Sequence, residues 1–331
     1  MMKRLDHYWY SQNPVAWLLL PLSWLFCAVS ILRRLIYVNG LLPAYGMPVP
    51  VIIVGNISVG GTGKTPLLIA VCEFLTRQGL KPGVVSRGYG ATASGEYSVE
   101  VNDDAATCGD EPVLIRQRTG CPVIIGSDRV AAAKKLLAEN DCDVILSDDG
   151  MQHYRLKRDI EIAVVDTLRK FGNGFCLPAG PLREPVSRLG KVDMLVYHGG
   201  SDDSYHFSLE FGEAVNLLTG EKRTLEGFTT GTVHAVAGIG HPERFFNQLR
   251  ASGVEVVEHA FPDHHAYTGD DIDYADNLPV LMTEKDAVKC KRLQDDTKSG
   301  ATMENIWAVP VSAKLSDPLG FGLIDLIQQH R

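Results

Sequence analysis

The sequence lacks several features that would each assign it to a broad class of proteins. It has no basic excess, because 32 Lys and Arg residues stand against 40 Asp and Glu and the formal net charge is −8 at pH 7. Nucleic acid is therefore not an expected partner, since binding it needs a basic face. The seven cysteines include no CxxC pair, so neither a disulfide framework nor a zinc site is indicated, and a reducing cytoplasm fits best.

The chain also lacks internal repeats and low-complexity tracts. Its 331 residues are 45% hydrophobic and 22% charged, a composition typical of a globular protein and not of a disordered or fibrous one. This length is enough for roughly two domains.

Beyond residue 48 the sequence alternates short apolar runs with stretches of helical periodicity. Residues 49–55 and 143–149 are predicted to be buried strands, and residues 65–79 and 128–140 are predicted to be helices. Continuously apolar strands that alternate with helices predict a parallel sheet covered on both faces, with the ligand at the carboxyl ends of the strands.

Changes in the pattern of apolar and polar residues divide the chain into three expected parts. Residues 1–40 contain an apolar helix, residues 41–229 form the core with a small antiparallel insertion near 204–224, and residues 230–331 form a smaller α/β domain. We expect the active site in the cleft between the core and the smaller domain.

Residues 58–65 read SVGGTGKT between a predicted strand and a predicted helix, which is the context of a phosphate-binding loop. Lys64 is expected to bridge the β- and γ-phosphates of a nucleotide, and the Thr65 hydroxyl to bind Mg²⁺. The fold class is therefore a P-loop NTPase-type α/β core. The predicted nucleotide-binding residues are Ser58, Val59, Gly60, Gly61, Thr62, Gly63, Lys64 and Thr65.

Two letters of this loop are unusual. Ser58 stands where the general pattern has glycine, and Pro66 follows the threonine, where proline suits the first turn of a helix. A related class of nucleotide-driven switch proteins has a lysine directly before the glycine pair, and here that position is Val59. Val59 counts against a dimerising switch without excluding one.

A second carboxylate for the metal is expected at the end of a neighbouring strand. Asp148 and Asp149 follow the apolar run 144–146, and because adjacent residues of a strand point to opposite sides, only one of them is expected to bind Mg²⁺ directly. Gln152 and His153 come next. A role in the site and ordinary loop polarity are equally good interpretations of this pair.

Residues 14–32 form an uncharged apolar run that is followed by two arginines. The run is about as long as a bilayer span, but Pro21 lies inside it. A transmembrane helix, a monotopic anchor with Trp17 and Trp24 at the headgroup level, and a buried helix are the alternatives. Membrane contact is favoured, whereas a cleaved signal peptide is not expected because Asp6 precedes the run and export would remove the loop from its nucleotide.

Eight sequence blocks, taken in order along nearly the whole chain, resemble the tetraacyldisaccharide 4′-kinase family of the lipid A pathway in Gram-negative bacteria. The blocks are GNISVGGTGKTP, SRGYG, GDEP, SDDGMQH, LPAGPLREP, AGIGHPERFF, FPDHHAYT and TEKDAVK.

The resemblance implies the reaction and its place. The γ-phosphate of ATP would pass to the 4′-hydroxyl of a tetra-acylated glucosamine disaccharide 1-phosphate, giving lipid IVA, with Mg²⁺ as the ion. The substrate is a membrane lipid, so the N-terminal helix would hold the protein at the cytoplasmic face of the bacterial inner membrane. No obligate protein partner is implied.

The resemblance also implies roles for residues that are far apart in sequence. Asp110 would be the catalytic base and His264 would support it, with Lys64 and Asp149 completing the catalytic set. Taken alone, Asp110 is equally an N-cap and His264 a loop histidine. Glu111 would contact the metal or cap the helix.

Arginines and an amide are expected on the phosphate groups, because the guanidinium fork suits phosphate. Each arginine taken alone is also interpretable as a surface side chain or a structural ion pair. The expected phosphate- and substrate-binding residues are Arg87, Arg129, Arg183 and Gln152.

The block TEKD does not indicate guanine recognition, because Lys285 lies one step later than in the guanine-reading pattern. ATP is the expected nucleotide. Two other function classes stay open on the residues alone: a membrane-associated NTPase switch without a phosphorylated lipid product, and a non-catalytic lipid-binding protein.

Overall fold

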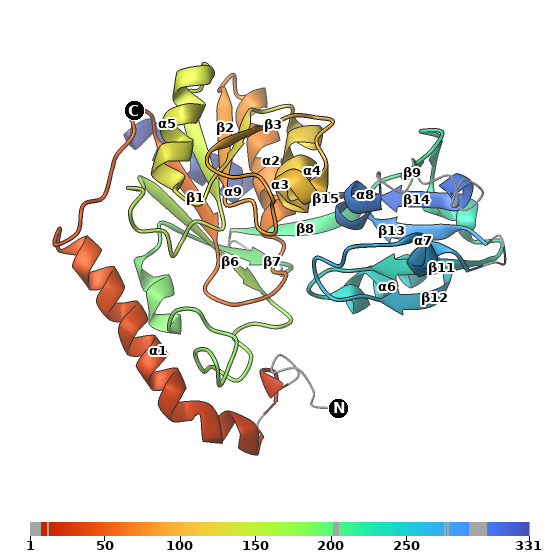
Figure 1. Cartoon of the computed structure of the whole chain (residues 1–331), viewed down its shortest axis with the longest axis horizontal. Coiled ribbons are helices and arrows are strands. Elements are labelled where there is room, and N and C mark those ends of the chain that lie inside the picture. The colour runs from red at the N-terminus through yellow and green to blue at the C-terminus, as the bar shows by residue number, and fades with distance from the viewer. Residues whose placement is uncertain are drawn as a thin grey trace.

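The chain folds around two β-sheets that lie side by side (Figure 1). The structure is a computed structural model, and it describes residues 8–11, 13–200, 205–274, 276, 278–290 and 303–330. The larger sheet has nine strands in the order β15-β8-β7-β6-β1-β5-β2-β4-β3. Its strands are β1 Val51–Gly55, β2 Pro82–Ser86, β3 Tyr97–Val99, β4 Val123–Ile125, β5 Val144–Asp148, β6 Ile160–Asp166, β7 Met194–His198, β8 His206–Phe211 and β15 Val311–Leu315.

The centre of the larger sheet is parallel and is covered by helices on both faces. Alternate residues of β1 point to opposite sides: Ile52 and Val54 join the apolar cluster under α2 and α9, whereas Val51 and Ile53 join the cluster under α5. The alternating pattern of the sequence predicts this layering. The helices of this unit are α2 Lys64–Arg77, α3 Ala105–Cys108, α4 Asp110–Thr119, α5 Arg129–Glu139 and α9 Asp317–Gln329, with a 3-10 helix at Val186–Lys191.

The smaller sheet has six strands in the order β10-β9-β14-β13-β11-β12. Its core contains Phe245, Phe246 and Trp307, and β11, β13 and β14 pair in parallel. The strands are β9 Ala214–Asn216, β10 Lys222–Arg223, β11 Thr232–Ala237, β12 Glu255–Ala260, β13 Val280–Thr283 and β14 Ile306–Val309. The helices are α6 Pro242–Ala251, α7 Gly269–Ile272 and α8 Glu284–Cys290, with 3-10 helices at Leu225–Phe228 and Met303–Asn305.

The chain crosses between the two sheets twice, and this differs from the expected division. The segment near 204–224, of which residue 204 lies outside the described part, is not a separate insertion: β8 joins the larger sheet, while β9 and β10 join the smaller one. After Pro310 the chain also returns, so that β15 and α9 belong to the larger unit. Alternation along a strand identifies the strand but not its partner, so the sequence could not assign these strands to a sheet.

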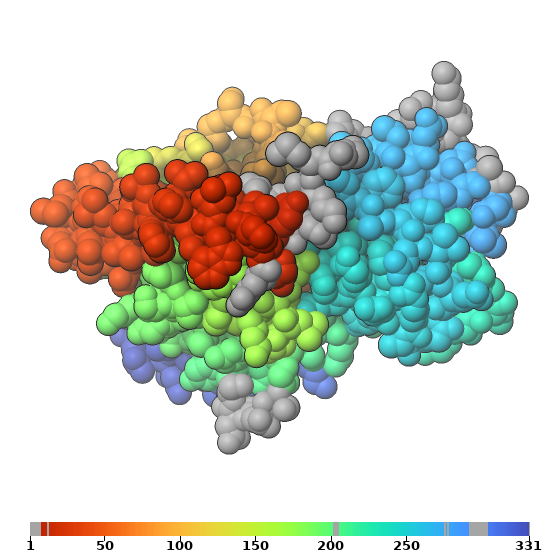
Figure 2. All heavy atoms as spheres, turned by 90° about the horizontal axis from the view of Figure 1, so that it is seen from below, coloured from red at the N-terminus to blue at the C-terminus, as the bar shows by residue number. Residues whose placement is uncertain are grey.

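The apolar N-terminal segment is one helix, α1 Pro14–Val38, which lies lengthwise on the larger unit (Figures 1 and 2). Ser23 Oγ donates a hydrogen bond to the Cys176 carbonyl at 2.7 Å, and the Trp17 ring meets Phe175 edge to face. The opposite face of α1 is exposed and apolar, with Leu18 at 81% exposure. By length and composition α1 is the one helix of the described residues that could cross a membrane.

The buried and exposed phenylalanines give a matched test of this packing. Phe246 is 1% exposed in the core of the smaller sheet, and Phe321 is 73% exposed on α9. We predict that Phe246→Ala lowers the free energy of unfolding by about 3–5 kcal/mol, because it leaves a cavity. Phe321→Ala changes it by less than about 0.5 kcal/mol. Urea unfolding followed by circular dichroism measures both, and equal losses would contradict the packing described here.

Candidate active site

A cavity of about 1740 Å³ opens between the two sheets, at the carboxyl ends of β1, β2 and β5. The phosphate loop (residues 58–65) contributes to its wall from the larger unit, and the loops of the smaller sheet contribute Gly240 and His264. Phe26, Val29 and Arg33 of α1 also line it. The cavity therefore connects the nucleotide loop with the apolar N-terminal helix.

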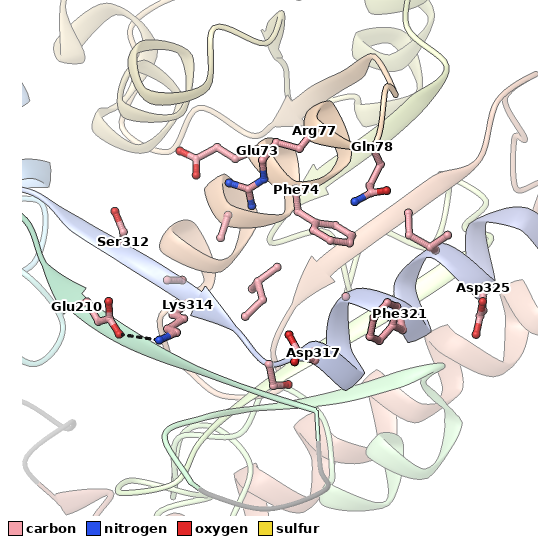
Figure 3. A pocket seen from close by; sticks show the side chains of 16 residues that line it. Glu73, Phe74, Arg77, Gln78, Glu210, Ser312, Lys314, Asp317, Phe321 and Asp325 are labelled. Atoms are coloured by element: carbon pink, nitrogen blue, oxygen red, sulfur yellow. Dashed lines mark ion pairs between the residues drawn. The ribbon is translucent and has the colours of Figure 1, made fainter.

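A second cavity, of about 570 Å³, lies between α2, β15 and α9 (Figure 3). Its lining mixes Phe74 and Phe321 with acidic and basic side chains, and Lys314 forms an ion pair with Glu210 at 3.8 Å. None of the site residues predicted from the sequence is among the residues that line it. The larger cavity is therefore the candidate active site.

The phosphate loop leaves β1 and enters α2 through two glycines with positive φ. Gly60 has φ 109° and Gly63 has φ 88°, conformations that side chains with a Cβ rarely adopt. Gly63 is needed for space as well, because a Cβ there would lie 2.8 Å from His198 Nδ1. The side chain of Asn56 holds the loop from inside. Its Nδ2 donates to Thr62 Oγ1 at 3.1 Å, and its Oδ1 accepts from Lys64 Nζ at 3.2 Å.

Asp149 lies between two cations at the mouth of β5. Its carboxylate contacts Lys64 Nζ at 3.6 Å and accepts a hydrogen bond from Arg183 at 2.8 Å. Burial alone would raise the pKa of Asp149, but Lys64 and Arg183 outweigh burial and lower this pKa to about 2. Asp149 is therefore ionised at neutral pH.

Asp148 is a buried carboxylate that lacks a full set of partners. Its Oδ2 accepts from Ser86 Oγ at 3.4 Å, but its Oδ1 has no hydrogen-bond partner among the described residues. Burial, followed by the charges of Glu111 and Asp149, raises the pKa of Asp148 to about 7. A buried carboxylate oxygen without a partner, beside a phosphate loop, fits a bound cation.

The residues around this carboxylate suit Mg²⁺ that arrives with a nucleotide. In the described part of the chain no group of three or more His, Cys, Asp or Glu side chains could hold a metal by itself. Mg²⁺ is usually bound by one or two carboxylates, with waters and substrate phosphates completing its shell. Asp148, Asp149 and the Thr65 hydroxyl all line the cavity and would supply the protein's share.

Arg129 presents an almost fully buried guanidinium to the same cavity. Its side chain is 4% exposed and donates to the Asp148 carbonyl at 2.9 Å. Its Nε and one terminal nitrogen have no partner among the described residues, and burial lowers its pKa to about 10. A buried cation with free donors fits the phosphate that was predicted for it.

Asp110 and His264 are in contact although they come from different units: His264 lines the cavity, and Asp110 is buried behind it. Asp110 begins α4, and His264 follows β12 of the smaller sheet. His264 Nδ1 donates to Asp110 Oδ2 at 3.0 Å, and this hydrogen bond raises the pKa of His264. Burial alone would raise the pKa of Asp110, but His264 and Lys285 outweigh burial and lower it to about 2.

The backbone is strained at two of the predicted catalytic residues. Asp149 has φ 45° and His264 has φ 60°, and in the described chain Lys170 is the third non-glycine residue with a positive φ. Such conformations are uncommon and cluster at functional sites, where the surrounding structure holds them.

Lys285 is a site residue that the sequence reasoning missed. Its ammonium contacts Glu111 at 3.0 Å, Asp263 at 3.3 Å and Asp110 at 4.0 Å. Burial would lower its pKa, but Glu111 and the two aspartates outweigh burial and raise it. The signal for it was the block TEKD, which belongs to the family resemblance and indicated a loop near the nucleotide without guanine recognition, but no role was assigned to Lys285. Because Glu111 is paired with Lys285, its contact with a metal stays a prediction.

The remaining predicted residues lie around the cavity in different ways. Arg87 is exposed on its wall. Gln152 Nε2 donates to the backbone carbonyl of Asn56 at 3.2 Å and to the Glu184 carboxylate at 2.9 Å. It therefore stabilises the start of the phosphate loop. His153 also lines the cavity, and burial lowers its pKa to about 4.

Comparison with known proteins decides the family. The family model described as "Tetraacyldisaccharide-1-P 4'-kinase" matches residues 15–328. The chain belongs to this family. A relative from Nitrosococcus oceani named tetraacyldisaccharide 4'-kinase is 48% identical over 97% of this chain and 94% of its own. A relative of the same name from Pseudomonas aeruginosa is 49% identical over 87% of this chain and 89% of its own.

A solved structure supports the tetraacyldisaccharide 4'-kinase fold. The LpxK protein of Aquifex aeolicus, crystallised in complex with ATP, superposes with a TM-score of 0.77 and is 28% identical, over 95% of this chain and 99% of its own. The family resemblance, the P-loop NTPase-type core and ATP as the nucleotide are therefore confirmed. The switch alternative is not favoured.

Two adjacent histidines test the Asp110–His264 pair of this kinase. His264 contacts Asp110, whereas His265 contacts Asp271 at 3.2 Å and stacks on Phe261. We predict that His264→Ala lowers kcat by about 100-fold, because Asp110, the predicted base, loses its hydrogen-bond partner. His265→Ala should change kcat by less than about twofold. Initial rates of phosphate transfer from ATP measure both, and similar losses would contradict the pairing.

Proposed function

We propose that the chain transfers the γ-phosphate of ATP to the 4′-hydroxyl of a tetra-acylated glucosamine disaccharide 1-phosphate, giving lipid IVA. One observation carries this proposal. The phosphate loop, Asp148, Asp149 and His264, which is hydrogen-bonded to the buried Asp110, gather at one cavity, and α1 contributes to the lining of the same cavity. The phosphate loop would bind the donor ATP, Asp148 and Asp149 would bind the metal, and the region beside His264 would bind the acceptor.

The donor side rests on positive groups that are already in position. The backbone N–H groups of residues 60–65 and the N-terminus of α2 bind the phosphates of ATP. Lys64 is held beside Asp149 and Asn56, and Arg129 offers its free donors, so both hold the γ-phosphate in line. When bound by Asp148, Asp149 and Thr65, Mg²⁺ supplies neutralisation of the phosphate charge.

The acceptor side requires a group that takes the proton of the 4′-hydroxyl. Asp110 is ionised at neutral pH because of its low pKa, and it is buried against His264. Its carboxylate accepts the hydroxyl proton as the oxygen bonds to phosphorus. His264 and Lys285 orient the carboxylate and stabilise its charge.

The membrane side of the site is α1. Its docked face buries Ala16, Leu20 and Ser23. Its exposed face carries apolar side chains, and two of these, Phe26 and Val29, also line the cavity. A lipid with four acyl chains does not leave the bilayer. We propose that α1 lies on the cytoplasmic face of the inner membrane as a monotopic anchor, where cytoplasmic ATP meets the lipid.

The proposed reaction is tested with the purified chain, γ-labelled ATP, Mg²⁺ and the tetra-acyl acceptor in detergent micelles. We predict labelled lipid from the wild type, and a loss of kcat of about 100-fold or more in Lys64→Ala and Asp110→Ala. Asp110→Ala should leave the Kd for ATP nearly unchanged, because Asp110 faces the acceptor. Binding of ATP without any labelled lipid would refute the proposed reaction.

The membrane role of α1 is tested with vesicles. Leu18 and Leu25 are 81% and 62% exposed on α1, so we predict that the double variant Leu18→Asp/Leu25→Asp no longer co-sediments with vesicles that contain anionic lipid, because charge opposes burial in the acyl region. Phe321→Asp on α9 is the control and should bind as the wild type does. Equal binding of all three proteins would contradict the role of α1.

A further inference from the structure

The ends of β6 and β7 form a buried polar site that the proposed mechanism does not use. Asp166 and His198 are the last residues of these strands and are paired in register. Both side chains are almost fully buried, with Asp166 at 1% exposure. The sequence reasoning assigned neither of them. A buried aspartate needs a partner, and its partner comes from the other sheet.

Arg244 supplies that partner from α6 of the smaller sheet. One terminal nitrogen of its guanidinium donates to Asp166 Oδ2 at 2.8 Å. The other lies 2.8 Å from His198 Nδ1 and 3.2 Å from His198 Nε2. Asp166 is held in turn, because its Oδ1 accepts from the Leu168 amide at 2.8 Å. This arginine therefore ties the smaller sheet to the strand ends of the larger one.

His198 carries the connection on to the phosphate loop. Its Nδ1 lies 3.1 Å from the Thr62 carbonyl oxygen. Its ring stacks on Phe207 with the ring centroids 4.7 Å apart, and it lies so close to Gly63 that a Cβ on that residue would not fit. Movement of the imidazole would therefore move the loop at Thr62 and Gly63, directly before Lys64.

Arg244 lies nearer to Nδ1 of His198 than to Nε2, but the Thr62 carbonyl can only accept and therefore requires the proton on Nδ1. A proton on Nδ1 is donated to the Thr62 carbonyl, which leaves Nε2 to accept from Arg244. A doubly protonated ring would lose this acceptor and face a cation. In agreement, burial and then the charge of Arg244 lower the pKa of His198 to about 4.

A second contact joins the same two segments. Gly240 precedes α6 and lies so close to the phosphate loop that a Cβ on it would come within 2.4 Å of the Gly61 nitrogen. The loop that positions Arg244 is thus in backbone contact with the loop that binds the nucleotide. Two independent contacts, one polar and one steric, couple the smaller sheet to the phosphate loop.

We propose that Arg244 is a positioning residue for ATP: through Asp166 and His198 it holds Thr62 and Gly63 in the shape that receives the phosphates. Arg244 also lines the cavity, but its guanidinium is already bound by Asp166 and His198, and we therefore assign its effect to the loop. The proposal rests on the proposed function in taking ATP as the ligand. It predicts that the affinity for ATP depends on a side chain of the smaller sheet.

The test compares Arg244→Ala with Arg250→Ala. Arg250 lies on the same helix and pairs with Glu258 at the surface. We expect Arg244→Ala to raise both the Kd for ATP, measured by calorimetry on the full chain without lipid, and the KM for ATP by about tenfold, which is the scale of one lost charge-assisted hydrogen bond. The KM for the acceptor should not change. Arg250→Ala should match the wild type in all three constants.

Further variants separate positioning from simple stability. Arg244→Lys keeps the charge beside Asp166 and should recover part of the affinity. Asp166→Asn combined with Arg244→Ala should be no weaker than Arg244→Ala alone, because both changes break one connection. A merely structural role would lower the Tm of Arg244→Ala and leave the Kd of the folded protein unchanged. If Arg244→Ala does not fold, Arg244→Gln replaces it in the same comparison.

Three results would overturn the proposal. They are a Kd for ATP within twofold of the wild type in the folded Arg244 variants, an equal effect of Arg250→Ala, or a fall in kcat with an unchanged Kd, which would mean that Arg244 acts in the transition state. The proposed function fails differently. A wild type that binds ATP in the calorimeter but labels no lipid refutes the kinase reaction, and the comparison of Kd values still stands.

Discussion

The site depends on the charge balance at the carboxyl end of β5. Asp148 is buried there, and Asp149 beside it is partly buried, with its side chain 31% exposed; leaving a buried carboxylate unpaired costs several kcal/mol. Lys64 and Arg183 compensate Asp149, but Asp148 keeps an oxygen without a partner. The fold thus maintains a place for one more cation at the position where a nucleotide would bring it. The phosphate loop and the buried Arg129 line the cavity at the same place. A Mg²⁺ ion bound there would be the additional cation.

The two sheets divide the chemistry between them. The larger unit holds the donor groups on the ends of parallel strands, where this fold places ligands. The smaller unit brings His264 and Lys285 to Asp110, and it brings Arg244 to the strands beside the phosphate loop. Because these contacts cross between units, the set of residues is complete only where the two units meet. The helix α1 borders the same cavity through Phe26, Val29 and Arg33.

The sequence predicts what is local and misses what is made by long-range contacts. The phosphate loop, the strand ends at Asp148 and Asp149 and the layering of helices follow from short patterns of glycine, charge and alternation. Asp110 and His264, which are 154 positions apart, could be paired only through the family resemblance. Arg244 and Lys285 lie in the blocks AGIGHPERFF and TEKDAVK, but neither block indicates a partner, and His198 lies in no block; their partners can be identified only from the contacts between the sheets. For the same reason, the sequence could not show that β8 and β15 belong to the larger sheet.

The most direct test of this account is a crystal structure of the full chain with Mg²⁺, a non-hydrolysable ATP analogue and the acceptor. The account predicts phosphates along residues 60–65, a metal bound to Asp148 or Asp149, and the 4′-hydroxyl hydrogen-bonded to Asp110. A nucleotide held elsewhere in the cavity, or an acceptor hydroxyl that does not contact Asp110, would contradict it.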